Sequence, residues 1–403
     1  MAERYPGGVI SKTPPVITGP TGGEGGSASG MWTLDTVLEY EKAGAWPKPV
    51  LPRELYTWGQ AAYGRLGDNT VVNKSSPVQV GNLVNWNKIN AGVTFSLSIK
   101  TDGALWGWGF NLFGSLGDGT QVLGRSSPIQ IGSLTNWYQA SAGGQHAQAI
   151  KTDGTLWGWG RNFFGQIGDG TLDYKSSPVQ IGALSNWDQV DAGAYHSVAV
   201  KTDSTIWTWG RGASGRLGHN NTIYRSSPVQ VGTLTSWQHG SAGDAHTMAV
   251  QLNNSLWGWG SNSFGRIGDN TTVYKSSPVQ IGALTNWSKV SAGQSHTTAI
   301  KTDGTLWAWG RNAIGQLGDN DNVNKSSPVQ VGSLTTWSSV SAGIDCSVAI
   351  KSDGTLWSWG SAADGRSGLG NLIPRSSPTQ IGSLTNWNSA SVFGSHVVAI
   401  TKG

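Results

Sequence analysis

The sequence predicts an all-β protein: a seven-bladed β-propeller closed by pairing of N- and C-terminal strands, with an extended N-terminal arm and one short helix. Three observations predict this fold. A tryptophan-rich motif recurs at a nearly constant interval, each interval holds the pattern of four short strands, and the end of the last repeat supplies a strand that the first repeat lacks. The 59 glycines and 22 tryptophans in 403 residues suit many short strands joined by tight turns.

The recurring motif is Trp-x-Trp-Gly. Neighbouring copies lie 50 residues apart, except for one interval of 51 in which Gln121–Gly124 holds an extra residue. The copies are Tyr56–Gly59, in which tyrosine replaces the first tryptophan, and then Trp106–Gly109, Trp157–Gly160, Trp207–Gly210, Trp257–Gly260, Trp307–Gly310 and Trp357–Gly360. A repeat of this length favours a propeller blade, because a linear β-solenoid uses shorter repeats.

One unit shows how a blade is expected to fold. Ser288–Ala292 and Thr297–Lys301 read as two strands, and Asp303-Gly304 forms the hairpin turn that follows. Thr305–Trp309 is the third strand, with its two tryptophans on one face. Ser327–Val331 is the fourth, and its proline is typical of an edge strand. Four such strands make one blade.

The two ends of the repeat region predict that the ring is closed. The chain stops at Gly403, just after the second strand of a unit, and the repeat region begins at Leu55–Gly59, which reads as a third strand. Pairing Val397–Ile400 with Leu55–Gly59 would complete one blade from both ends. It would also leave no open sheet edge between the first and last blades.

The units resemble repeats of the regulator of chromosome condensation family. The resemblance is carried by Leu-Trp-x-Trp-Gly, Gly-x-Leu-Gly, Ser-Ser-Pro-Val-Gln and Ala-Gly-x-x-His, and it covers Leu55 to Gly403. It implies a seven-bladed propeller, but the family's functions range widely, so the fold alone does not assign one. Some members are nucleotide exchange factors that use a protruding wedge. No unit here carries an insertion longer than one residue, which disfavours that activity.

The sequence divides into three parts: residues 1–30, a flexible Gly/Pro-rich arm; residues 31–53, a short helix and linker; and residues 54–403, the propeller. Thr33 or Asp35 can cap the helix, and Gly44 can end it. A helix this short is marginal in water, so its apolar residues need a surface to cover them. The expected anchoring residues are Trp32, Leu34, Leu38, Tyr40 and Trp46.

Residues 29–47 resemble a module at the ends of bacteriophage structural proteins, on the segments Ser29–Leu34 and Lys42–Pro47. This resemblance implies a virion component, a tail-fibre or receptor-binding protein or a capsid-decorating protein, that is synthesised in the host cytoplasm. Its expected partners are other virion structural proteins, bound through the arm, with a host surface receptor or glycan and a homo-oligomer as further candidates. Two alternatives remain open: the arm is a plain linker, or the chain is a bacterial surface or secreted propeller that acts as an adhesin or protein-binding module.

Bulk properties narrow the class of partner. The net charge of +4 is small and spread along the chain, so we expect no nucleic-acid partner. No apolar run approaches the roughly 20 residues that span a bilayer, and the N-terminus lacks the apolar core of a secretory signal, so we expect no membrane insertion. The single cysteine, Cys346, excludes an intramolecular disulfide.

Several residue types that could carry chemistry recur in nearly every unit, which favours a structural role. Histidine recurs at His146, His196, His246, His296 and His396, where the other two units have Phe95 and Cys346. We expect each histidine to donate to a backbone carbonyl within its own blade and Cys346 to be a small buried side chain. The recurring aspartates, such as Asp118, are expected to cap turns. The repeated tryptophans are expected to pack between blades rather than to bind sugars. We therefore predict no catalytic residue, no metal site and no cofactor.

A basic residue precedes each Ser-Ser-Pro motif, and a second basic series includes Lys100 and Lys151. These residues could attract an anionic ligand. A need common to all blades is the favoured explanation, either pairing with the aspartates of the hairpin turns, such as Asp102 and Asp153, or solubility.

Binding function is expected where the copies differ, and the loop after Trp-x-Trp-Gly differs most. Two neighbouring units carry aromatic residues beside arginine there, a combination typical of protein-binding hot spots. The Gly-x-x-His loop also varies. The predicted partner-binding residues are Phe110, Leu112, Phe113, Arg161, Phe163, Phe164 and Tyr195. The alternative is that Phe113 and Phe164 pack beneath their own loops.

Overall fold

In the computed structural model, the described residues are 4–5, 8–9 and 52–403. The predicted helix and the anchoring residues Trp32, Leu34, Leu38, Tyr40 and Trp46 lie outside this described part. Near the N-terminus, β1 (Arg4–Tyr5) pairs antiparallel with β2 (Gly8–Val9). Residues Arg53–Lys402 form a separate compact unit.

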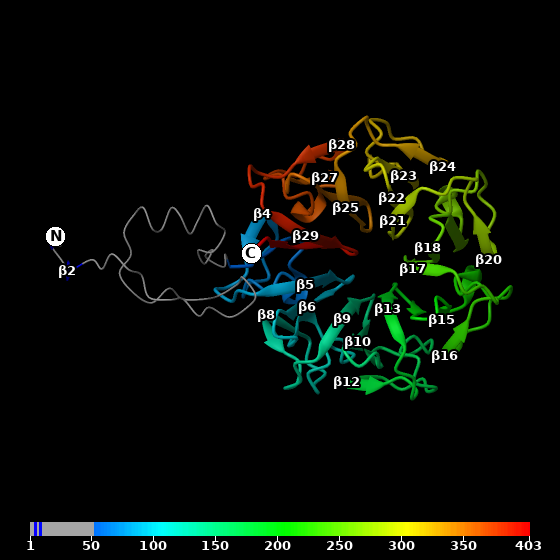
Figure 1. Cartoon of the computed structure of the whole chain (residues 1–403), viewed down its shortest axis with the longest axis horizontal. Helices are drawn as coiled ribbons and strands as arrows, with labels where there is room; N and C mark the ends of the chain where they lie inside the picture. The colour runs from blue at the N-terminus through cyan, green and yellow to red at the C-terminus, as the bar shows by residue number, and fades with distance from the viewer. Residues whose placement is uncertain (1–3, 6–7, 10–51) are drawn as a thin grey trace. The chain divides into compact units, whose positions relative to one another are not determined.

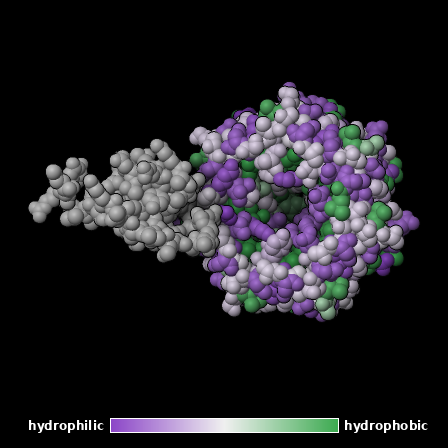
Figure 2. Space-filling model, viewed as in Figure 1, coloured by the Kyte–Doolittle hydropathy of each residue, from purple (hydrophilic) through white to green (hydrophobic). Residues whose placement is uncertain are grey.

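This unit consists of seven four-stranded antiparallel sheets, arranged as blades around a central axis (Figure 1). The space-filling view shows a hollow at the centre of the ring (Figure 2). The closing blade has the strand order β29-β30-β3-β4 and the others follow the chain. The closing blade contains β29 (Trp387–Val392), β30 (His396–Thr401), β3 (Leu55–Gly59) and β4 (Lys74–Gln79). Blade two contains β5 (Trp86–Ala91), β6 (Phe95–Lys100), β7 (Leu105–Phe110) and β8 (Gly124–Gln130). Blade three contains β9 (Trp137–Ala142), β10 (His146–Lys151), β11 (Leu156–Gly160) and β12 (Lys175–Gln180).

The remaining blades repeat the same plan. Blade four contains β13 (Trp187–Ala192), β14 (His196–Lys201), β15 (Ile206–Gly210) and β16 (Arg225–Gln230). Blade five contains β17 (Trp237–Ala242), β18 (His246–Gln251), β19 (Leu256–Gly260) and β20 (Lys275–Gln280). Blade six contains β21 (Trp287–Ala292), β22 (His296–Lys301), β23 (Leu306–Gly310) and β24 (Lys325–Gln330). Blade seven contains β25 (Trp337–Ala342), β26 (Cys346–Lys351), β27 (Leu356–Gly360) and β28 (Arg375–Gln380).

The predicted closure is confirmed. β30 pairs with β3 in the register Leu55↔Ile400 to Gly59↔His396, so strands from both ends of the repeat region share one sheet. The predicted strands of blade six are also confirmed, with bounds that differ by one or two residues. Within residues 52–403 the helical turns are short 3-10 turns: η1 (Ala62–Gly64), η2 (Ala213–Gly215), η3 (Ser263–Gly265) and η4 (Ala363–Gly365).

The hydrophobic core lies between neighbouring blades, as the repeated tryptophans predicted. Trp309 of blade six is fully buried against Met248 and Leu256 of blade five. On the opposite face of the same strand, Leu306 and Ala308 pack against blade seven. Each blade therefore buries both faces, and the two tryptophans of a third strand meet the first-strand tryptophan edge to face, as Trp287 does with Trp307 and Trp309.

Candidate functional site

The loops between the first and second strands of the blades form one mouth of the central axis, which we call the axial mouth. Six of the seven begin with glycine, and each glycine lies against the next blade. A Cβ added at Gly293 would lie 2.6 Å from the carbonyl oxygen of Gly343, closer than real Cβ atoms approach. Glycine is therefore needed where adjacent loops touch.

Backbone hydrogen bonds link these loops in sequence around the axis. The amide after each glycine donates to the glycine carbonyl of the next blade over 3.0 to 3.3 Å. The five pairs are Val93–Gly143, Gly144–Gly193, Ala194–Gly243, Asp244–Gly293 and Gln294–Gly343. Within residues 52–403, no equivalent bond connects Ile344 with the closing blade or the closing blade with Gly92. The ring of hydrogen bonds is thus open on both sides of the closing blade.

Phe393 stands in the closing blade where the other six blades have glycine. Its side chain lies at the boundary between a cavity in the axial mouth and the channel below it. Phe393 was not among the residues predicted from the sequence, although the sequence holds a signal for it. It is the one departure from glycine at this position of the repeat.

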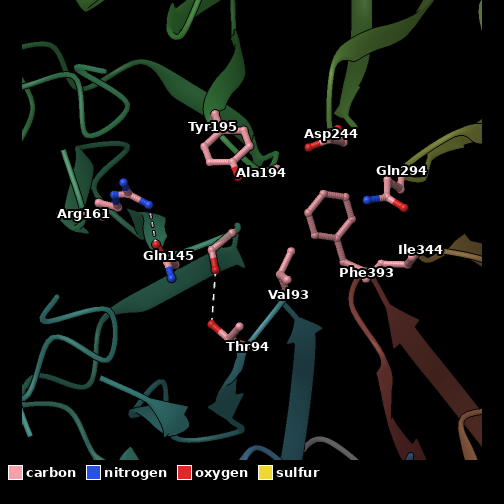
Figure 3. A pocket seen from close by; sticks show the side chains of 11 residues that line it. Val93, Thr94, Gln145, Arg161, Ala194, Tyr195, Asp244, Gln294, Ile344 and Phe393 are labelled. Carbon is pink, nitrogen blue, oxygen red and sulfur yellow. Dashed lines mark hydrogen bonds between the residues drawn. The ribbon is translucent and has the colours of Figure 1, made fainter. Parts of the chain in front are cut away.

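The mouth cavity has a volume of about 200 Å³ and is lined by residues from all seven blades. Figure 3 shows the ring of Phe393 pointing into the space between Val93, Asp244 and Gln294, with Tyr195 on the opposite side. Arg161 reaches the edge of the cavity, where its Nη1 donates to Oε1 of Gln145 over 2.8 Å. The other lining residues are Thr94, Gly144, Ala194 and Ile344. The cavity thus combines an aromatic wall with amide, hydroxyl, carboxylate and guanidinium groups.

Below the mouth, the first strands contribute small polar residues to the channel, including Asp191, Ser241 and Ser291. Asp191 is satisfied within the protein: it accepts hydrogen bonds from the Ser141 hydroxyl at 2.8 Å and the Ala242 amide at 2.9 Å. Burial raises the pKa of Asp191, and these hydrogen bonds oppose that rise. The polar side chain of Asp191 in the channel is therefore explained by the hydrogen bonds that it makes to neighbouring blades.

An aromatic belt extends from this cavity across four adjacent blades. Its rings meet edge to face, with centroids 4.9 to 5.7 Å apart. The guanidinium carbon of Arg161 lies 5.2 Å from the Phe113 ring and 5.9 Å from the Phe163 ring. Arg211 lies 5.1 Å from Phe164 and 5.4 Å from Tyr195. The belt comprises Tyr63, Phe110, Phe113, Phe163, Phe164, Tyr174, Tyr195 and Tyr224.

The predicted partner-binding residues take different places in this belt. Leu112 and Phe163 are exposed, whereas Phe110 is buried. Phe113 and Phe164 are half-buried among other rings. They are therefore neither fully exposed for partner binding nor fully packed beneath their own loops. Two predicted residues, Arg161 and Tyr195, line the mouth cavity. Among the lining residues that were not predicted are Phe393, Asp244 and Gln294. Asp244 lies in the Gly-x-x-His loop, which differs between copies.

Five arginines contact the mouth loops or the aromatic belt. Within residues 52–403, Arg65, Arg161, Arg211, Arg216 and Arg266 have no carboxylate within ion-pair distance, whereas Arg311 pairs with Asp345 at 2.9 Å. Arg65 and Arg216 are almost fully buried, and each binds a mouth-loop carbonyl of the next blade, Val93 and Asp244 respectively. Burial lowers the pKa of both to about 10. These buried arginines therefore position the mouth loops.

The repeated histidines join neighbouring blades, so the prediction that each bonds a carbonyl within its own blade is wrong. His196 Nε2 lies 2.8 Å from the hydroxyl of Thr247 in the next blade, and that hydroxyl donates to the carbonyl of Arg216 at 2.9 Å. Because the hydroxyl proton is used, His196 must donate through Nε2. The equivalent pairs are His146–Ser197, His246–Thr297, His296–Ser347 and His396–Ser96. Burial lowers the pKa of His146 and His296 to about 3 and holds the pKa of the other three well below 6.5.

The two repeated basic series have structural partners that only partly match those expected. In the five blades that have a turn aspartate, the residue before Ser-Ser-Pro pairs with it rather than with the Asp102 series, as Arg125 does with Asp118 at 2.9 Å. Asp118 also caps its turn as predicted, because it accepts the amide of Thr120 at 3.0 Å. In the other two blades His219 and Leu369 hold the position of that aspartate. The second series stacks on tryptophan: Nζ of Lys151 lies 3.6 Å from the ring centroid of Trp157. The charges of Lys151 and Asp153 interact as expected.

Other site classes find little support in the described residues. Residues 52–403 contain no group of three or more His, Cys, Asp or Glu side chains arranged to hold a metal ion. Cys346 is a small buried side chain as predicted, and burial raises its pKa to about 12. In the same part of the chain, no helix has the length and apolar character to cross a membrane.

Comparison with known proteins identifies the family of this chain. The chain matches the RCC1-like domain over residues 149–400 and the regulator of chromosome condensation (RCC1) repeat over residues 54–99 and 102–150. A stretch of 121 residues, 29% of this chain, is 33% identical to the ultraviolet-B receptor UVR8 of Arabidopsis thaliana and covers 27% of that protein. Another of 127 residues, 30% of the chain, is 31% identical to the human E3 ubiquitin-protein ligase HERC2 and covers 3% of it. The chain therefore matches less than a third of either relative.

Two solved structures share the fold over most of the propeller. Human WBSCR16 has a TM-score of 0.79 at 19% identity, over 87% of this chain and 99% of that chain. Prp20p of Saccharomyces cerevisiae has a TM-score of 0.78 at 20% identity, over 87% and 92%. The domain match over more than half of the residues and the closed seven-bladed ring agree: this chain belongs to the family of RCC1-like domains.

Proposed function

We propose that this chain is a non-enzymatic binding protein that recognises a macromolecular partner through the axial mouth and the aromatic belt beside it. The observation that carries the proposal is the placement of variation. Residues repeated in the blades are used in packing, turns or contacts between blades, whereas Arg161, Tyr195, Asp244 and Phe393 differ between copies and gather at one cavity. Exposed aromatic residues beside arginine are common at protein interfaces.

More specifically, we propose that the chain is a bacteriophage virion component. Its N-terminal arm would anchor it to the particle, and its propeller would bind a partner outside the particle. The support for this proposal is the resemblance of residues 29–47 to a module of bacteriophage structural proteins and the Gly-rich composition of residues 1–30. The alternative is a bacterial surface or secreted propeller that binds its partner in the same way. Both versions use the mouth face for recognition and differ in what the arm attaches to.

The arm can be tested by deleting residues 1–52. We expect the remaining propeller to keep its thermal unfolding temperature, because β3 and β30 that close the ring are intact, and to lose incorporation into phage particles assembled in the same cells. A control variant lacks residues 1–28 and keeps the segment that resembles the phage module; it should still be incorporated. Incorporation of the chain without residues 1–52 would contradict the anchoring role. Binding of the truncated propeller to host cells tests the recognition role separately.

A further inference from the structure

We propose that the mouth cavity binds an acidic sugar, a pyranose ring that carries a carboxylate, as one unit of a cell-surface polysaccharide. The inference rests on the proposed binding role of this face and names the class of ligand. It depends on four features of the cavity: an aromatic wall, polar groups without partners, arginines without acids, and a volume that suits one ring.

The aromatic wall is provided by Phe393, which faces the open space of the cavity rather than another ring (Figure 3). Val93 and Ile344 extend this apolar surface. A pyranose presents C–H bonds on its ring faces and hydroxyls around its edge. An aromatic face can cover those C–H bonds while the hydroxyls stay free for hydrogen bonds.

Three polar groups around this wall have no hydrogen-bond partner within residues 52–403: the Asp244 carboxylate, the Gln294 amide and the Tyr195 hydroxyl. All three side chains are half-buried. Together they offer both donors and acceptors, which is what a ring with several hydroxyls requires, because each hydroxyl donates and accepts. An apolar anchor from a protein would cover these groups without satisfying them, at a cost.

Arg161 and Arg211 supply the preference for an acid. Their guanidinium faces lie against Phe113 and Phe164, and within the described chain neither has a carboxylate partner. The Nε of each is buried, and Nη1 of Arg161 donates to Oε1 of Gln145. Within residues 52–403 this leaves Nη2 of Arg161 and both Nη atoms of Arg211 as donors for the oxygens of a carboxylate. Arg161 lines the cavity itself, and Arg211 stacks against Tyr195, which is also a lining residue.

Two other ligand classes fit less well. A cation could use the Asp244 carboxylate and the aromatic rings, but Asp244 is the one carboxylate among the described residues that line the cavity, and Arg161 lines the same cavity. An acidic peptide could use the arginines, but it carries several carboxylates, of which some would approach Asp244, whereas a sugar acid carries one. The volume of about 200 Å³ is also below the roughly 300–1,000 Å³ of pockets for drug-sized ligands, which favours a single ring.

The test titrates the full chain with the methyl glycosides of galacturonate, glucuronate and N-acetylneuraminate, and with methyl galactoside and methyl glucoside as neutral controls. A hexaglutamate peptide tests the peptide class. Binding is followed by isothermal titration and by saturation transfer from the aromatic protons. We expect at least one sugar acid to bind with a Kd of about 1 mM, as befits one small ring, and its neutral counterpart to bind at least about tenfold more weakly.

Three variants locate the site. Phe393→Gly restores the residue of the other six blades, and Arg161→Gln removes the charge at the cavity edge. We expect each to weaken sugar-acid binding by about tenfold. Arg311→Gln is the matched control, because Arg311 holds the same loop position in blade six but pairs with Asp345. It should change the affinity by less than about twofold. Unfolding temperatures near that of the parent chain show that each variant is folded.

The outcomes separate this inference from the proposed function. Binding of hexaglutamate instead of the sugars, equal binding of acid and neutral sugars, or no binding of any sugar acid at about 10 mM would overturn the acidic-sugar site. The general binding role would still stand if host cells bind the full chain and the Phe393→Gly variant equally well. Sugar-acid binding without any host-cell binding would support the site and count against recognition of the host surface.

Discussion

Substitutions between copies of the repeat have different consequences at the junctions between blades and at the axial mouth. At the junctions, changes are compensated by the facing blade. Phe95 replaces a histidine and faces Ala147 rather than a hydroxyl, and Cys346 replaces another and faces Val397. At the mouth, Phe393 replaces a glycine, and no bond among residues 52–403 restores the two hydrogen bonds missing from the ring.

The compensation also involves the group that donates a hydrogen bond to the loop carbonyl at each junction. At histidine junctions the facing hydroxyl donates to a loop carbonyl, as Thr247 does to Arg216. At the two apolar junctions a tryptophan N–H is the donor that remains: Trp159 donates to the Ser115 carbonyl at 3.0 Å and Trp58 to the Arg366 carbonyl at 3.2 Å. One histidine junction has both donors, because Trp359 and Ser347 each donate to the Gln316 carbonyl. Variation with compensation serves packing, because buried polar groups must stay paired. Variation without compensation marks the surface where a ligand can supply the missing partners.

The largest expected effect on stability comes from acid, which should destabilise the junctions that contain the five repeated histidines. The five histidines are neutral when folded, since their pKa values lie far below 6.5, whereas unfolding exposes them to protonation. Their contribution is fully present above about pH 6.5 and is lost as the pH falls toward the folded pKa values. Five such groups should lower the free energy of unfolding by up to about 7 kcal/mol between pH 7.5 and 5.5.

Thermal and urea unfolding at pH 7.5, 6.5 and 5.5 checks this expectation. The buried Asp191 works in the opposite direction, because its raised pKa favours the folded state in acid, but it is a single group. The aspartates with lowered pKa values, such as Asp118, titrate only below this window. An unfolding temperature that stays constant from pH 7.5 to 5.5 would show that the histidines are not held neutral.

A double-mutant cycle sharpens the comparison at one junction. His196→Phe alone should destabilise the chain by about 2–4 kcal/mol, because the larger ring meets the Thr247 side chain and the inter-blade hydrogen bond is lost. Adding Thr247→Ala reproduces the Phe95–Ala147 junction and should recover about 1–2 kcal/mol. Urea unfolding of the parent, both single variants and the double variant measures the coupling. Strictly additive effects would refute compensation between blades.

The sequence was sufficient to predict the closed ring because its signal is repeated. The interval of the tryptophan motif and the missing strand at Leu55–Gly59 defined the blades before any contact was known. The site was harder to predict, since its residues come from all seven blades. Arg161 and Tyr195 were found because they vary between copies, and Phe393 was missed because its motif, ending in His396, otherwise looks regular.

The partners of repeated residues could not be predicted from one unit. The histidine was expected to bond within its blade, but the propeller places the next blade's second strand against it, and only the ring brings His146 to Ser197. The pattern that reveals this lies across units: the residue after the histidine position of a unit is Ser or Thr where the preceding blade has histidine, and Ala147 or Val397 where it does not. Pairing each unit with its neighbour would have predicted the contact.

Phe393→Gly is the variant with the smallest expected effect on stability, and this small effect would distinguish the mouth from the junctions. Phe393→Gly removes a half-buried ring that packs at a cavity and allows the closing blade to adopt the loop of the other six. The lost apolar contact and the regained backbone hydrogen bonds oppose each other, so the free energy of unfolding should change by less than about 1 kcal/mol. Urea unfolding measures it, with Phe95→Gly as the control that should cost about 3–5 kcal/mol from a fully buried site. A comparable loss for Phe393→Gly would place Phe393 in the packing of the ring, whereas near-neutral stability together with lost sugar-acid binding would assign it to recognition.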